Sequence, residues 1–240
     1  MTSLYIKGLI SVVGKLLALP ANTAGITEDQ RAAWVAFSKK IPPVPSSGTG
    51  ADAILEPGSK LPPGTSNSEN AEMYNVHPYR IFSAGKQGVD NTIAKKSFSK
   101  VRFKSNSGWC QLPADAAILG LGSLSDPMAA PQLVASRAAV APAAGYRFPA
   151  FMPHFQDYMP SADHLGIFSG AVVNMLLLPA DDAAGSAVLL PAWPCGWDVD
   201  FKLAGPKQAV VSGSMKAGVL SWSVVPSARK PFITAAACQK

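Results

Sequence analysis

The hydrophobic pattern of this chain changes its period once, at Pro179, and this change limits the folds that the chain can adopt. Before Pro179, apolar residues recur at the three- and four-residue intervals of amphipathic helices. After it, short apolar runs alternate with turn residues, as they do in strands. Helices followed by a small antiparallel sheet predict an α+β fold, with a helical-hairpin region over residues 1–180 and a C-terminal β-domain over residues 187–236.

The helical pattern is interrupted by one long loop. Residues 42–68 are dense in Pro, Gly and Ser and have no apolar period, which predicts irregular structure. Around this loop the pattern predicts helices over residues 3–19, 27–40, 78–84, 90–103, 113–120, 126–140 and 165–178. Thr27 and Gln30 have the spacing of a capping box at the start of the second helix. The last helix is apolar all round, so we expect it to be buried on all sides.

The region after Pro179 reads as a set of short strands. The pattern predicts them over residues 187–190, 198–203, 209–215, 219–225 and 232–234. Residues 216–218 have the composition of a hairpin turn. Trp193 and Trp197 stand next to prolines, so we expect them to fill the joint between the helical and β regions, with stacking on a sugar ring as the alternative.

Ionisable side chains gather directly before the last predicted helix. His154, Asp157, Asp163 and His164 fall in one short segment, although only 15% of the residues are charged. They match no strong metal-ligand spacing, so we expect no metal site. Asp163 also stands where a helix cap belongs, and a capping aspartate accepts a backbone N–H bond whether or not it does chemistry. Spacing alone therefore leaves both interpretations of Asp163 open.

Three further features argue against nucleic acid, a membrane and zinc as partners. They are the charge, the N-terminal segment and the cysteines. The net charge is +6, but the one basic cluster, within residues 95–104, comes with no nucleic-acid motif and reads as a solvated helix face. Lys15 interrupts the apolar N-terminal segment, so we expect neither a membrane span nor a cleaved signal peptide. Cys110, Cys195 and Cys238 lie far apart without a CxxC spacing. A zinc knuckle or a disulfide framework is not indicated, and a single bridge stays open.

Four segments together resemble a known family of enzymes. NAEMYNVHPYRIFSAGK (70–86), GWCQLPADAAILGLG (108–122), RFPAFMPHFQDYMPSADHLG (147–166) and VLLPAWPCGWDVDFKLAGP (188–206) stand in this order in the chain. Their order and spacing are similar to those in the C-terminal half of six-hairpin glycosidases. More narrowly, the chain resembles relatives of glycoside hydrolase family 95, whose described members are inverting α-L-fucosidases. The resemblance covers most of residues 10–230.

This resemblance implies an (α/α)6 toroid, in which helical hairpins surround a central cleft, followed by a β-rich domain. The chain corresponds to about half of such a toroid plus the sheet. Asp163 matches the aspartate that activates water, and His164 is implied to orient it. Glu72 is the most plausible stand-in for the acid. Trp109 and Tyr158 are implied to line the sugar subsite, together with His154 and Asp157.

The implied function is that of a glycoside hydrolase whose partner is carbohydrate, without a cofactor, in an extracellular or periplasmic location. An inverting enzyme needs two carboxyl groups about 6.5–9.5 Å apart. No residue here matches the family's acid, so we expect that the chain alone does not hydrolyse glycosides at an enzymatic rate. The missing N-terminal half of the toroid is then a candidate partner. The alternative is a non-catalytic remnant that binds carbohydrate or a partner chain through the same cleft.

Overall fold

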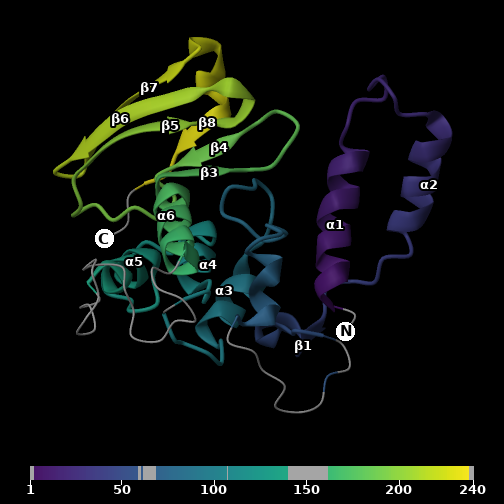
Figure 1. Cartoon of the computed structure of the whole chain (residues 1–240), viewed down its shortest axis with the longest axis horizontal. Coiled ribbons are helices and arrows are strands. Elements are labelled where there is room, and N and C mark those ends of the chain that lie inside the picture. The colour runs from purple at the N-terminus through teal and green to yellow at the C-terminus, as the bar shows by residue number, and fades with distance from the viewer. Residues whose placement is uncertain (1–2, 59–60, 62–68, 107, 140–161, 238–240) are drawn as a thin grey trace.

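A computed structural model describes residues 3–58, 61, 69–106, 108–139 and 162–237 (Figure 1). Its α-helices are α1 (Ser3–Leu17), α2 (Glu28–Ser38), α3 (Thr92–Ser99), α4 (Leu112–Ile118), α5 (Ala130–Ala138) and α6 (Ala162–Leu176). Its strands are β1 (Ser46–Ser47), β2 (Ile54–Leu55), β3 (Leu177–Pro179), β4 (Ala187–Leu189), β5 (Val199–Ala204), β6 (Val210–Lys216), β7 (Val219–Val225) and β8 (Ile233–Ala235). The fold is α+β, as the change of period at Pro179 predicts.

The longer strands form two sheets. In the described residues, β5, β6 and β7 make an antiparallel sheet in that order, and β3, β4 and β8 make a second, mixed sheet in that order. The expectation of a wholly antiparallel arrangement is wrong in one place, because β4 pairs with β8 in parallel. Strand β3 was expected to be the end of a helix, since its residues continue the apolar run of α6. Both sheets lie beyond the C-terminal end of α6 (Figure 1).

One predicted helix does not form. Residues 78–84 make turns instead, and a 3₁₀ turn, η2 (Ala71–Asn75), precedes them. The backbone N–H of Phe82 bonds to the Asn75 carbonyl at 3.0 Å, and that of Ala84 bonds to the Ile118 carbonyl of α4 at 2.8 Å. These N–H groups therefore join distant segments rather than the preceding turn of a helix.

The core lies where α4 meets α6 and the strands that follow it. Every residue of α4 is buried, and the buried cluster continues through Met175, Leu178 and Leu189. Trp193 belongs to the same cluster and contacts the ring of Trp197 edge-on, with centroids 5.7 Å apart. Its indole N–H bonds to the Trp197 carbonyl at 2.9 Å. Trp193 is therefore held in the protein interior and is not exposed for stacking on a sugar.

The burial expected for the last helix is only partly correct. Met175 and Leu176 of α6 are buried, but Leu165 and Val173 are 39% and 47% exposed. An apolar sequence cannot by itself show which of its faces lacks a neighbour. The N-terminal part of α6 instead stands partly in solvent, beside the cleft described below.

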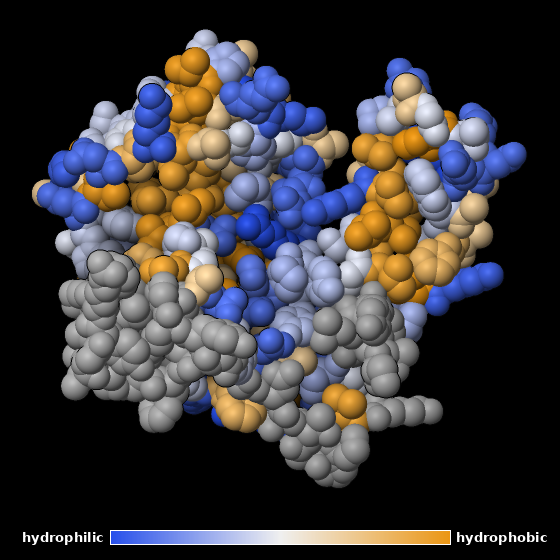
Figure 2. All heavy atoms as spheres, viewed as in Figure 1, coloured by the Kyte–Doolittle hydropathy of each residue, from blue (hydrophilic) through white to orange (hydrophobic). Residues whose placement is uncertain are grey.

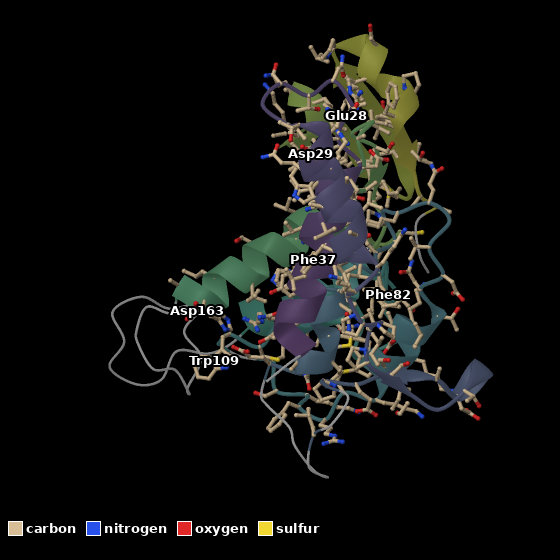
Figure 3. The ribbon with its side chains drawn as sticks, turned by 90° about the vertical axis from the view of Figure 1, so that its right-hand side faces the viewer. Glu28, Asp29, Phe37, Phe82, Trp109 and Asp163 are labelled. Atoms are coloured by element: carbon tan, nitrogen blue, oxygen red, sulfur yellow. The ribbon has the colours of Figure 1, made fainter. Side chains whose placement is uncertain are left out.

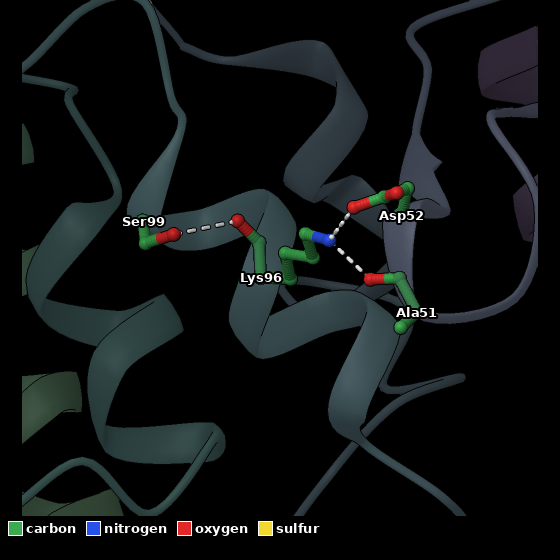
Figure 4. A network of polar contacts seen from close by, with 4 residues as sticks. All are labelled: Ala51, Asp52, Lys96 and Ser99. Atoms are coloured by element: carbon green, nitrogen blue, oxygen red, sulfur yellow. Dashed lines mark hydrogen bonds and ion pairs between the residues drawn. The ribbon is translucent and has the colours of Figure 1, made fainter.

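Part of the predicted irregular loop is attached to the basic cluster. Strands β1 and β2 pair with each other, and a 3₁₀ turn, η1 (Gly50–Asp52), lies between them. Figure 4 shows Lys96 of α3 bonding to the carboxylate of Asp52 at 2.9 Å and to the Ala51 carbonyl. Lys96 lowers the pKa of Asp52 through this contact. This member of the basic cluster thus attaches a loop to α3.

Two further expectations concern cysteines and membranes. Cys195 is disulfide-bonded, so the single bridge that the sequence left open exists, and Cys110 is a buried free thiol. Within the described ranges, no helix is both long and apolar enough to cross a membrane.

Candidate functional site

A cleft of about 480 Å³ opens beside the N-terminal part of α6. Its walls come from α6, from the start of α4 and from the segment around η2. The described lining residues are Glu69, His77, Trp109, Gln111, Ala114, Ala162, Asp163, Gly166, Ile167, Gly170 and Asn174. This volume lies in the range of sites for small molecules, and the lining mixes carboxylates, amides and one aromatic ring.

One face of α6 forms the longest wall. Asp163, Gly166, Gly170 and Asn174 recur at the three- and four-residue spacing that places side chains on the same side of a helix. A Cβ atom added to Gly166 or Gly170 would meet no atom of the described residues within 4 Å. Glycine is costly inside a helix. The two glycines therefore leave open space along the wall at the expense of helix stability.

Asp163 and Trp109 meet at this cleft. Asp163 is exposed in the first turn of α6, and Trp109, on the loop before α4, is 39% exposed (Figure 3). The helix begins at Ala162, so Asp163 lies inside it and not at the capping position before it. A carboxylate in the first turn is also favoured by the helix dipole. The structure brings these two predicted site residues together.

The second predicted carboxylate, Glu72, does not line the cleft, but the nearby Glu69 does. Glu72 belongs to η2 and is not among the lining residues, whereas Glu69 is. Asn70 has a φ of +50° and turns the chain between the two glutamates. The hydroxyl of Tyr74 donates a hydrogen bond to Glu69. Burial, followed by this bond, raises the pKa of Tyr74 well above its usual range.

His164 lies in the interior and is not among the described lining residues. It is fully buried, and Nη1 of Arg137 lies 3.3 Å from both its Nδ1 and its carbonyl oxygen. Burial lowers the pKa of His164, and the charge of Arg137 lowers it further. The geometry fits a packing role against α5 better than the orienting of Asp163, because adjacent residues of a helix point in different directions.

The remaining polar groups of the cleft can bind hydroxyl groups. Burial lowers the pKa of His77, with a smaller effect from Arg80, so its ring is neutral at neutral pH. Nη2 of Arg80 donates to Oδ1 of Asn174 at 3.0 Å, which leaves the amide N–H groups of Asn174 as donors toward a ligand. Gln111 contributes a second amide. Together with the carboxylates, these groups offer donors and acceptors around one aromatic ring.

Three predicted site residues cannot be placed. Tyr158, His154 and Asp157 lie outside the described residues, so their roles stay predictions. In the part of the chain that is described, no group of three or more His, Cys, Asp or Glu side chains could hold a metal ion.

The chain matches no protein-family model and no curated protein. The resemblance to glycosidases therefore stays a prediction that rests on the four segments alone.

Proposed function

We propose that the chain is a glycoside hydrolase-like protein and that the cleft beside α6 binds a sugar. One observation carries the proposal: Asp163 and Trp109, which lie on separate segments, line the same open cleft, and Glu69 lines it too. A partly exposed indole gives a flat apolar platform with a polar edge. Carboxylates and amides at its border provide the hydrogen bonds that sugar hydroxyls need.

In this proposal the site follows the inverting scheme, with Asp163 as the carboxylate that activates water. Glu69 takes the place of Glu72 as the stand-in for the acid, because Glu69 lines the cleft with Asp163. The toroid belongs to the same proposal. The helical hairpins are part of such a ring, and the chain that completes it is a candidate partner.

A second candidate is a carbohydrate-binding protein without activity. A general acid works best with a pKa raised toward the working pH. Asp115 is a described carboxyl group whose pKa is raised well above the usual range, but it is fully buried and does not line the cleft. This separation favours binding without rapid hydrolysis by the chain alone.

Isothermal calorimetry tests binding: the purified chain is titrated with L-fucose and with a panel of other monosaccharides. We expect saturable binding that Trp109→Ala weakens about tenfold, a loss of roughly 1.4 kcal/mol. Trp222→Ala is the matched control, because Trp222 lies on β7 and is not a lining residue. No binding by the wild type, or equal binding by Trp109→Ala, would count against the proposal.

The variant Gly170→Leu distinguishes a loss of sugar binding in the cleft from a loss of folding stability. A Cβ atom at this lining position meets no described atom within 4 Å, and leucine is a better helix former than glycine by roughly 0.8 kcal/mol. We therefore expect the variant to lose sugar binding while remaining at least as stable as the wild type in urea unfolding.

Activity is tested by nitrophenol release from aryl glycosides, α-L-fucoside included. We expect no enzyme-like turnover from the chain alone. Asp163→Asn, Glu69→Gln and Glu72→Gln are the comparison variants. Turnover that is abolished by Asp163→Asn and Glu69→Gln, but not by Glu72→Gln, would remove the non-catalytic alternative and assign both carboxylates.

A further inference from the structure

A second cavity, of about 180 Å³, lies between α1 and the segment that follows η2. It shares no described lining residue with the sugar cleft. Its polar lining consists of Ser11 and Lys15 from α1, Tyr79 and Lys86 from the facing segment, and Asp181 from the loop after β3. Figure 2 shows hydrophilic side chains gathered in the hollow between the α1–α2 hairpin and the rest of the molecule.

Lys86 is the unusual group in this cavity. Its side chain is half-buried, and among the described residues its ammonium group has neither a hydrogen bond nor an ion pair. Burial lowers the pKa of Lys86, and although Asp181 opposes this, the charges of Lys15 and Arg80 lower it further. Desolvating a cation without a partner is unfavourable, and nearby cations add to the cost.

Asp181 does not balance these charges. Its Oδ2 lies 3.6 Å from Nζ of Lys15, beyond hydrogen-bond distance, and the Lys15 side chain is 58% exposed. Exposed pairs of this kind contribute little to stability, because solvent screens them. Two lining cations, those of Lys15 and Lys86, therefore share one carboxylate, and the charge of Arg80, which is not a lining residue, acts on Lys86 as well.

The cavity also has room for a ligand. Gly14 lines it, and a Cβ atom added there would meet no atom within 4 Å. The hydroxyl groups of Ser11 and Tyr79 can donate hydrogen bonds to an oxyanion. We propose that this cavity binds a phosphate group, with Lys15 and Lys86 as its charged partners and with Ser11 and Tyr79 as hydroxyl donors. A bound phosphate joins α1 to the body of the protein.

The probe is inorganic phosphate, titrated at constant ionic strength and followed by the amide NMR signals of α1. We expect saturable binding and slower amide hydrogen exchange in α1 when phosphate is bound. Lys86→Met should weaken binding at least tenfold. Gly14→Leu should do the same while both lysines remain, because Gly14 lines the cavity and its added Cβ meets no described atom within 4 Å, so the larger side chain takes up ligand space. Lys40→Met, an exposed position after α2, is the control and should bind as the wild type does.

Three results would overturn the proposal. They are shifts that follow ionic strength without saturating, wild-type affinity in Gly14→Leu, and acetate binding as tightly as phosphate. None of these variants alters a residue of the sugar cleft, so a failure of the phosphate proposal leaves the sugar-binding experiment unaffected.

Discussion

At the scale of single residues, Arg137 is the buried cation that organises the protein beneath the cleft. It is fully buried, and its guanidinium donates to Asn106 Oδ1 at 2.9 Å and to the carbonyls of Gly108, Cys110 and His164. Burial lowers its pKa to about 10, and no carboxylate among the described residues pairs with it. Its hydrogen bonds hold the chain before α4 against α5 and α6.

We expect Arg137→Met to lower the free energy of unfolding by about 3 kcal/mol, because the substitution leaves several buried carbonyls without a donor. Arg137→Lys should be nearly as damaging, since one ammonium cannot reproduce the planar fork of donors. Urea unfolding measures both. Arg102→Met, at an exposed position, serves as the control. A loss below about 0.5 kcal/mol in both Arg137 variants would contradict this assignment.

Asp115 makes stability depend on pH. Burial raises its pKa well above the usual range, the backbone N–H of His77 opposes the rise, and the Glu72 carboxylate adds to it. The folded chain therefore keeps a proton that the unfolded chain releases above about pH 4. The unfolding free energy should fall as pH rises from there toward the folded pKa, by up to about 1.4 kcal/mol per pH unit.

Asp115→Asn carries no titratable group, so we expect it to lose this part of the slope and to gain stability relative to the wild type as pH rises. Urea unfolding between about pH 5 and pH 7 measures the difference. Equal slopes for the two proteins would show that Asp115 is ionised in the folded state.

The sequence predicted part of the site because local patterns place side chains near the start of a helix. Asp163 stands in the first turn of an apolar helix and Trp109 precedes another helix, and both line the cleft. Glu69 was missed because its direction depends on the positive φ of Asn70, which the sequence does not display. The burial of His164 could not be predicted, because it depends on contacts with Arg137, a residue distant in the chain.

At the scale of elements, the β6–β7 hairpin shows how a turn can be improved. Lys216 pairs with Val219, so Ala217 and Gly218 form the turn, with φ values of +48° and +79°. Turns with two positive φ values prefer Asn-Gly, because a non-glycine residue other than Asn or Asp is strained there. The N–H of Ala217 also donates to Oδ1 of Asp198 at 2.9 Å.

Ala217→Asn should therefore raise the free energy of unfolding by roughly 0.5–1 kcal/mol. Gly218→Ala should lower it by a similar amount or more, although the nearest atom to its new Cβ lies 3.9 Å away, because the penalty comes from φ alone. Thermal unfolding compares the two variants. Shifts of the same sign would show that backbone strain does not control this turn.

Elements were predictable where their signals are local. The capping box of Thr27 and Gln30 is confirmed, with both reciprocal bonds formed at the start of α2. The turn at residues 216–218 is also confirmed. The predicted helix over residues 78–84 failed because the N–H groups of Phe82 and Ala84 bond to carbonyls outside the preceding turn. Strand β3 was hidden in an apolar run shared with α6. Only tertiary contacts decide these two cases.

At the scale of the whole molecule, the α1–α2 hairpin stands to one side of the remaining elements (Figure 1). No residue of α2 is buried, and Val13 is the one buried residue of α1 among those whose side chains are described. Few buried apolar contacts mean a low free energy of local opening. In contrast, α4 is buried throughout.

We therefore expect the amides of α1 and α2 to exchange with solvent at a lower free energy of opening than those of α4, measured without phosphate by hydrogen exchange and mass spectrometry. Opening of the hairpin should depend only weakly on denaturant, since it exposes little surface. Equal protection in α2 and α4 would mean that the hairpin unfolds together with the core.

The parallel pairing of β4 with β8 has a consequence for how the chain is made. Residues 187–189 are synthesised before their partner residues 233–235, and the whole β5–β6–β7 sheet is synthesised between them. At ~5–20 residues per second, this wait lasts several seconds on the ribosome. During that interval one edge of β4 has no partner strand, and an open edge can pair with another chain. Nascent copies on one messenger RNA are therefore most prone to aggregate after β4 has emerged and before β8 has.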